Sequence, residues 1–206
     1  MSIIIAVSEY CYNVNDVNFE NNLKDSFNKV FGGKKFIICC IGTDAVIGDC
    51  LGPMIGSRLK ENIGGKSYIF GSVEAPIIAK DIKSLSEVLS LCFVNTPILA
   101  IDAAFGVAGE LGHVKFCETP LKPGLGVNKD LPLIGTHSLI GILAKKGDDF
   151  LNSVRFSSVL PFVDKICRAI EGYFFENSDL SINNTDFSDF SLNFDNLPFN
   201  LLKNAN

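Results

Sequence analysis

The sequence predicts an α/β fold, a three-layer sandwich in which a mostly parallel, twisted sheet is covered by helices on both faces. Three observations lead to this fold class: a β-α-β-α-β rhythm in the first half of the chain, strand-like runs that are apolar throughout, and a composition of 206 residues with 47% hydrophobic and 20% charged side chains. Strands that are apolar on both faces are typical of parallel sheets. Alternating strands and helices imply right-handed crossovers. This length suits a single α/β domain with a sizeable core.

Helices are predicted where apolar residues recur every three or four positions. The first runs from Phe19 to Phe31 and is stopped by two glycines, and the second runs from Leu51 to Ile63 and is stopped in the same way. A third includes Ile82 and Leu89.

Strands are predicted over three apolar runs that alternate with these helices. They cover residues 36–41, 68–73 and 98–103. Further along, residues 106–118 suggest a hairpin or an edge strand, and the Pro- and Gly-rich residues 119–135 suggest a long loop.

Two more helices are expected after this loop. One helix is predicted to begin near His137, and a last one carries an apolar face from Val159 to Phe174. The expected organisation is an N-terminal extension with a helix (1–35), an α/β domain (36–175) and a polar, mobile C-terminal tail (176–206).

Composition excludes several classes of protein. The net charge of −5 gives no electrostatic footprint for nucleic acid, and the N-terminal SIIIAV is too short to span a bilayer. The seven cysteines include no C-x-x-C pair, so neither a disulfide framework nor a zinc ribbon is expected. The chain is therefore expected to be cytoplasmic, without direct contact to nucleic acid or membrane.

Two aspartates, each following an apolar run, are the strongest candidates for chemistry. Asp49 lies in FIICCIGTDAVIGDCLGP and Asp102 in TPILAIDAAFG. Ligands and chemistry collect at the carboxyl ends of the strands in open α/β sheets, where two carboxylates can act as an acid/base pair. Asp49 could equally serve as the N-cap of the following helix. Asp102 is harder to explain structurally, because a carboxylate that ends a buried strand is costly unless it is hydrogen-bonded or used.

Other polar groups are weaker candidates, which we assign to substrate binding. Asp44 shares the loop with Asp49 and is also a good turn residue, while Glu74 follows the second strand and is also a good solvated turn residue. His137 could join the aspartates as a metal ligand or simply cap a helix. Cys50 would need a partnering base to act as a nucleophile, and none is evident nearby.

The residues also carry a family resemblance. The segments GTDAVIGDCLGP, ILAIDAAFG and PLKPGLGVNKDLPLIGTHSLIGI, in this order, resemble the YyaC family of sporulation proteins. That family is similar to the spore germination endopeptidase and, more distantly, to the hydrogenase maturation peptidases. The resemblance covers about Phe36 to Phe174 and implies a phosphorylase/hydrolase-like α/β fold.

The resemblance also implies a function. The aspartates held to be catalytic in the endopeptidase match Asp49 and Asp102, and the metal-binding histidine of the maturation peptidases is a looser match to His137. We therefore expect a sporulation-associated peptidase of aspartate type, without bound metal or cofactor. It would act on a protein or peptide, with small acid-soluble spore proteins as candidates, in the cytoplasm of the sporulating cell or forespore. The alternatives are a non-catalytic peptide- or ligand-binding protein and a metal-assisted maturation peptidase.

Overall fold

A six-stranded mixed sheet forms the centre of the molecule in the computed structural model, which describes residues 9–124, 131–147 and 154–177. The sheet order is β1-β5-β6-β4-β2-β3; β2, β3, β4 and β6 run parallel, and β5 runs antiparallel to both of its neighbours. The strands are β1 (Glu9–Asn13), β2 (Ile37–Cys40), β3 (Ile69–Phe70), β4 (Ile98–Gly106), β5 (His113–Cys117) and β6 (His137–Lys145). The helices are α1 (Phe19–Phe31), α2 (Leu51–Ile63), α3 (Ile82–Cys92) and α5 (Phe156–Glu176), with short 3₁₀ turns η1 (Ile47–Asp49) and η2 (Ala108–Glu110).

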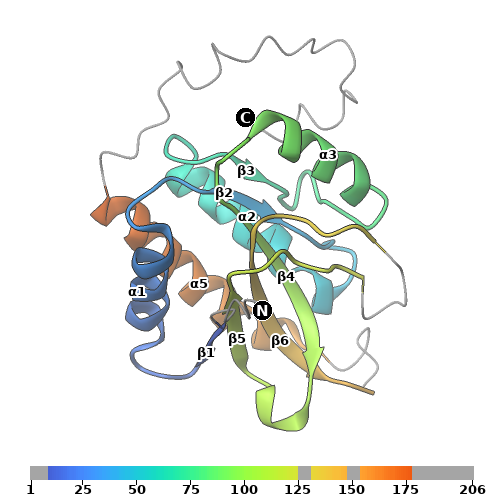
Figure 1. Cartoon of the computed structure of the whole chain (residues 1–206). Coiled ribbons are helices and arrows are strands. Elements are labelled where there is room, and N and C mark those ends of the chain that lie inside the picture. Colours follow the sequence, from blue (N-terminus) through green and yellow to red (C-terminus); the bar gives the residue numbers. More distant parts are fainter. Residues whose placement is uncertain (1–8, 125–130, 148–153, 178–206) are drawn as a thin grey trace, which may run out of the picture.

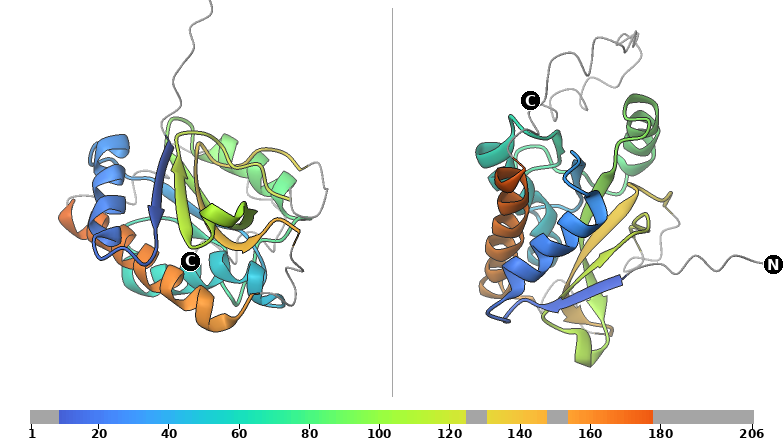
Figure 2. Two further views of the ribbon diagram at one scale, coloured as in Figure 1. Left: turned by 90° about the horizontal axis from the view of Figure 1, so that it is seen from below. Right: turned by 60° about the vertical axis from the view of Figure 1, so that its left-hand side comes forward.

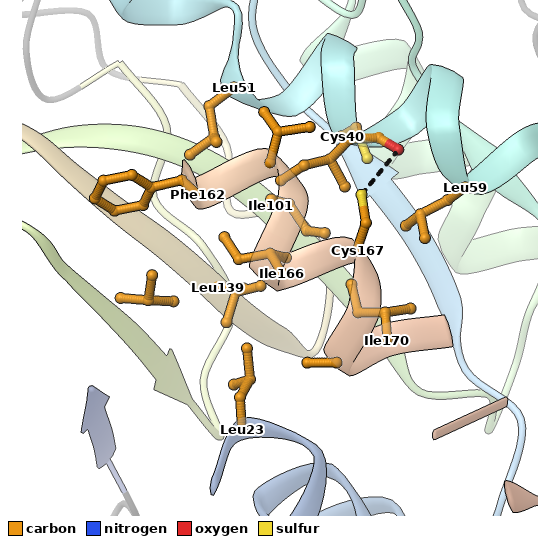
Figure 3. Close-up of a cluster of buried hydrophobic side chains, with 14 of the residues drawn as sticks. Leu23, Cys40, Leu51, Leu59, Ile101, Leu139, Phe162, Ile166, Cys167 and Ile170 are labelled. Carbon is orange, nitrogen blue, oxygen red and sulfur yellow. Dashed lines mark hydrogen bonds between the residues drawn. The ribbon is translucent and has the colours of Figure 1, made fainter. Parts of the chain in front are cut away.

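The helices cover the two faces of the sheet unequally. Helices α1, α2 and α5 lie on one face and α3 lies on the other, which gives the expected three layers (Figures 1 and 2). On the three-helix face, Leu51 of α2 and Ile166 of α5 pack over Ile101 and Leu139 of the sheet (Figure 3). Burial of such apolar side chains, at about 25 cal/mol per Å², is the main force that holds the layers together.

The strand order reverses direction at β2. This strand pairs with β3 on one side and β4 on the other, so the chain leaves β2 in one direction and then crosses back to β4. The loops that follow β2 and β4 therefore diverge at the carboxyl ends of the strands, which is where α/β proteins bind ligands.

Strand β4 continues past the end of β2. The last paired residues are Cys40 and Ile101, and the N–H of Ile41 donates a 2.8 Å hydrogen bond to the carbonyl of Ile101. Asp102 is the next residue of β4, and it pairs only with Ile140 of β6. Asp102 thus lies where the strand order reverses, one residue beyond the end of the pairing between β4 and β2.

The helix predicted to begin near His137 is wrong, because His137 opens strand β6. Most of this strand is buried on both faces, so its sequence is a nearly continuous apolar run without polar alternation. A run of this length cannot be assigned to helix or strand by periodicity alone. Gly141 confirms the close packing, since a Cβ there would lie 2.5 Å from the side chain of Leu51.

Residues 106–118 contain one strand, β5, and form neither a hairpin nor an edge strand, so that prediction is also wrong. Strand β5 lies between β1 and β6, and β6 separates it from β4. The predicted strand over 68–73 shortens to β3, because Gly71 turns the chain with a φ of +86°. The helices α1, α2 and α3, the strands β2 and β4, and α5 are confirmed at or near their predicted positions.

The N-terminal residues belong to the same sheet as the rest. Strand β1 forms an antiparallel ladder with β5, and α1 packs beside α5 on the three-helix face. Of the tail expected from residue 176, all but the first two residues lie outside the described part of the chain. Within the described ranges, no helix is both long and apolar enough to cross a membrane.

Candidate functional site

The loop between β2 and α2 brings Asp49 back to the end of β2. Gly42 has a φ of +130°, and a Cβ built on it would lie 2.1 Å from the carbonyl oxygen of Asp49. The N–H of Thr43 donates to that same carbonyl at 3.0 Å, and the N–H of Gly42 donates to Ile77 at 2.9 Å. Only glycine permits this approach, because any side chain at residue 42 would collide with backbone.

A second glycine holds the start of α2 against the same strand. A Cβ on Gly52 would lie 2.0 Å from the carbonyl oxygen of Ile41. The helix therefore touches the end of β2 at backbone distance just after Asp49. These two contacts fix the position of Asp49 from both sides along the chain.

Asp49 does not cap α2. The N-cap residue is Cys50, and no side chain makes a capping hydrogen bond there. The structural alternative for Asp49 as a helix cap is therefore wrong, and its carboxyl group needs another explanation.

Asp102 lies on the α3 face of the sheet and is partly buried. Its Oδ1 accepts a 2.8 Å hydrogen bond from the N–H of Ala103. Cys39 of β2 is fully buried nearby; burial raises the pKa of its thiol, and the charge of Asp102 raises it further. The Cys39 thiol is therefore a neutral, apolar neighbour for the carboxyl group.

The two aspartates share one electrostatic environment. Burial raises the pKa of Asp102 to about 8, the charge of Asp49 adds to this shift, and the Ala103 N–H opposes it. Burial also raises the pKa of Asp49 to about 6, against a hydrogen bond from the Thr43 N–H. Of the two carboxyl groups, Asp102 therefore has the higher pKa and is the more readily protonated.

Asp44 and Cys50 lie beside the pair but differ from it. Asp44 is exposed, and its charge reaches Cys50. The Cys50 thiol donates to the carbonyl of Ile47 at 3.0 Å, and burial raises its pKa. A thiol held protonated in this way is a poor nucleophile.

Glu74 follows β3 at the same edge of the sheet but turns toward the outside of α2. Its side chain is exposed and accepts a 3.1 Å hydrogen bond from the hydroxyl of Ser57, in the second turn of α2. Hydrogen bonds from its own N–H and from the hydroxyls of Ser72 and Ser57 lower the pKa of Glu74. Glu74 is therefore an exposed, ionised group at the periphery of the carboxyl ends of the strands.

His137 is not brought to the aspartates. It is paired with Leu99, three residues before the Asp102–Ile140 pair, which is about 10 Å along the strands. Its ring packs on the three-helix face against Phe31, at 4.8 Å between centroids, and burial lowers its pKa. Across the described ranges, no three His, Cys, Asp or Glu side chains gather closely enough to hold a metal ion.

Gly42 and Gly52 shape the candidate site, and the sequence did not single them out. Both lie in GTDAVIGDCLGP, at the ends of the segment that carries Asp49. Glycines that bracket a candidate carboxylate were the available signal, because they mark close backbone approach as well as turns.

The comparisons with known proteins agree with this fold. The chain is 34% identical over 125 residues to "Uncharacterized protein YyaC" of Bacillus subtilis (strain 168), a match that spans 61% of this chain and 60% of that protein. It is also similar in structure to the [NiFe] hydrogenase maturation protease HycI from Thermococcus kodakarensis KOD1, with a TM-score of 0.51 and 18% identity over 73% of this chain and 99% of HycI. The second likeness shows that the two chains share an α/β fold.

A family model extends the relationship toward the N-terminus. The model for proteins of unknown function DUF1256 matches residues 8–169, so it includes β1 and α1, which the sequence resemblance had left out. The chain belongs to the DUF1256 family.

Proposed function

We propose that this protein is a peptidase-like hydrolase that uses Asp49 and Asp102 as a general acid/base pair. The observation that carries the proposal is the raised pKa of both carboxyl groups, at the point where the strand order reverses. Perturbed carboxyl groups in a crevice are typical of catalytic sites.

The division of labour follows from the two pKa values. Asp49, with the lower value, is ionised at neutral pH and takes a proton from the attacking water. Asp102, with the higher value, is protonated and donates a hydrogen bond to the oxygen of the scissile carbonyl. As the C–N bond breaks, the proton that Asp49 has taken passes to the leaving amine.

The substrate is proposed to be a protein or peptide, and the setting to be the cytoplasm of a sporulating cell. The peptidase-like fold shared with HycI supports a peptide substrate, and the similarity to YyaC supports a link to sporulation through the family resemblance. Small acid-soluble spore proteins are the first substrates to test.

The experiment is a search for new protein termini. The purified wild-type chain and the Asp49→Asn/Asp102→Asn double variant are incubated with spore proteins at pH 7, and new N-termini are identified by mass spectrometry. We expect cleavage by the wild type only. A folded wild type that binds spore proteins without producing new termini would contradict the hydrolase and favour a non-catalytic binding protein.

A further inference from the structure

A cavity of about 360 Å³ lies at the edge of the sheet opposite the aspartates, beside the amino ends of β2 and β3. Three lysines line it, Lys34 and Lys35 before β2 and Lys66 before β3. Two aromatic residues, Tyr68 and Phe93, also line it, and their ring centroids lie 5.6 Å apart. This lysine groove combines positive charge with an aromatic wall.

Such a lining favours ligands with a particular combination of side chains. Ammonium groups favour carboxylates, and partly buried aromatic rings favour other aromatic side chains. The volume holds a few side chains of a peptide but no folded domain. The groove therefore fits a short segment in which acidic and aromatic residues are neighbours.

The described chain ends beside this groove. The Tyr173 hydroxyl of α5 donates a 2.6 Å hydrogen bond to the carbonyl of Lys34, and the Asn177 amide donates to Asn28 of α1 at 3.2 Å. The ammonium of Lys66 lies 6.0 Å from the ring centroid of Phe175. Whatever follows Asn177 therefore starts within reach of two of the groove lysines.

The sequence that follows has the matching composition. Residues 178–206 contain four aspartates, four phenylalanines and one lysine. Two Asp-Phe pairs occur close together, Asp186-Phe187 and Asp189-Phe190. The eight residues between Asn177 and Asp186 span up to about 30 Å when extended, which is ample for this distance.

We propose that the lysine groove binds residues 186–190 of the same chain, with the aspartates toward Lys34 and Lys66 and a phenylalanine against Tyr68 and Phe93. Because the segment is tethered next to the groove, its effective concentration is in the millimolar range and weak contacts suffice. This inference does not depend on the proposed hydrolase, since the groove and the aspartates lie at opposite edges of the sheet.

The test is limited proteolysis of the full-length chain with chymotrypsin, followed by mass spectrometry of cleavage after Phe187 and Phe190. Docking protects these bonds, so the free peptide 178–206 is expected to be cut at least about fivefold faster than the same bonds in the wild type. Lys34→Glu/Lys66→Glu is expected to raise cleavage in the chain by a similar factor. Adding Asp186→Lys/Asp189→Lys to that variant is expected to restore protection.

The matched control is Lys83→Glu/Lys146→Glu, which makes the same change of charge at exposed sites away from the groove. Equal cleavage of the wild type and the free peptide, or equal acceleration by the control, would overturn the proposal. Protection that rises with protein concentration would also overturn it, because the occupant would then come from a second copy.

Discussion

The two edges of the parallel strands differ in what they contain. At the carboxyl edge, Asp49 is positioned by close backbone contacts, and both Asp49 and Asp102 have raised pKa values. At the amino edge lie the lysine groove and a larger cavity of about 530 Å³ that is lined in part by His137. The larger cavity and the carboxyl groups with raised pKa values therefore lie at opposite ends of the parallel strands.

On the proposed function, the carboxyl groups with raised pKa values mark the site of chemistry, and the larger cavity does not. A large hollow is the usual starting hypothesis for a binding site. Here the cavity near His137 is lined by groups such as Ser86 and Ser90, whose hydroxyls donate to backbone carbonyls at 3.0 and 2.7 Å. The aspartates instead bear a cost of burial that only use or compensation explains.

The largest effect is expected from removing either carboxyl group. Asp49→Asn and Asp102→Asn should each lower kcat/KM for a cleaved spore peptide by about 10²–10⁴, the usual contribution of a general acid or base. His137→Phe, at the other edge, should change it by less than about twofold. If His137→Phe lowered kcat/KM as much as the aspartate variants do, the chemistry would not be confined to the carboxyl edge, and the proposed site would be contradicted.

The next effect tests how the carboxyl edge is built. Gly52→Ala should lower the free energy of unfolding by roughly 2–4 kcal/mol, because its Cβ would lie 2.0 Å from the Ile41 carbonyl. Gly65→Ala is the matched control, since a Cβ there meets nothing within 4 Å. Denaturant unfolding measures both. Equal stability of the two variants would show that the contact with β2 is readily relieved.

The sequence predicted the part of this architecture that periodicity encodes. Helix α2 was predicted with its observed ends, and Asp102 was assigned to the right strand, because buried helices and parallel strands have distinct apolar patterns. It failed at β6, where the apolar run fits both a helix and a strand. The role expected for His137 depended on that error, since a helix start could have pointed its ring toward the aspartates.

The remaining features of the site come from tertiary contacts. The approach of Gly42 to the Asp49 carbonyl joins residues seven apart through a loop whose path no local pattern specifies. Likewise, the pKa of Asp102 depends on burial by segments far away in the sequence. The sequence could therefore identify both aspartates as candidates but could not predict which of them has the higher pKa.

A smaller effect tests that proton directly through stability. The raised pKa means that folded Asp102 keeps its proton from about pH 4 to about pH 8 while the unfolded chain loses it, so folding stability falls as the pH rises through this range. Asp102→Asn removes this penalty. The variant should gain about 4 kcal/mol relative to the wild type between pH 5 and pH 8.5, because each unit of pKa is worth about 1.4 kcal/mol. A difference in Tm that does not change with pH would show that Asp102 titrates normally.

The smallest effect is expected at the amino edge. There, folding stability changes with pH in the opposite direction to that expected for Asp102. Because burial lowers the pKa of His137, the unfolded chain binds a proton more readily, and stability falls as the pH drops below about 6.5. His137→Phe keeps an aromatic ring against Phe31 and Phe116 but cannot be protonated. Between pH 7 and pH 5.5 it should lose less stability than the wild type, by about 1 kcal/mol at most. Thermal unfolding at the two pH values measures this. A variant that loses as much stability as the wild type would show that His137 carries no pH dependence, and the two edges would then differ in the aspartates alone.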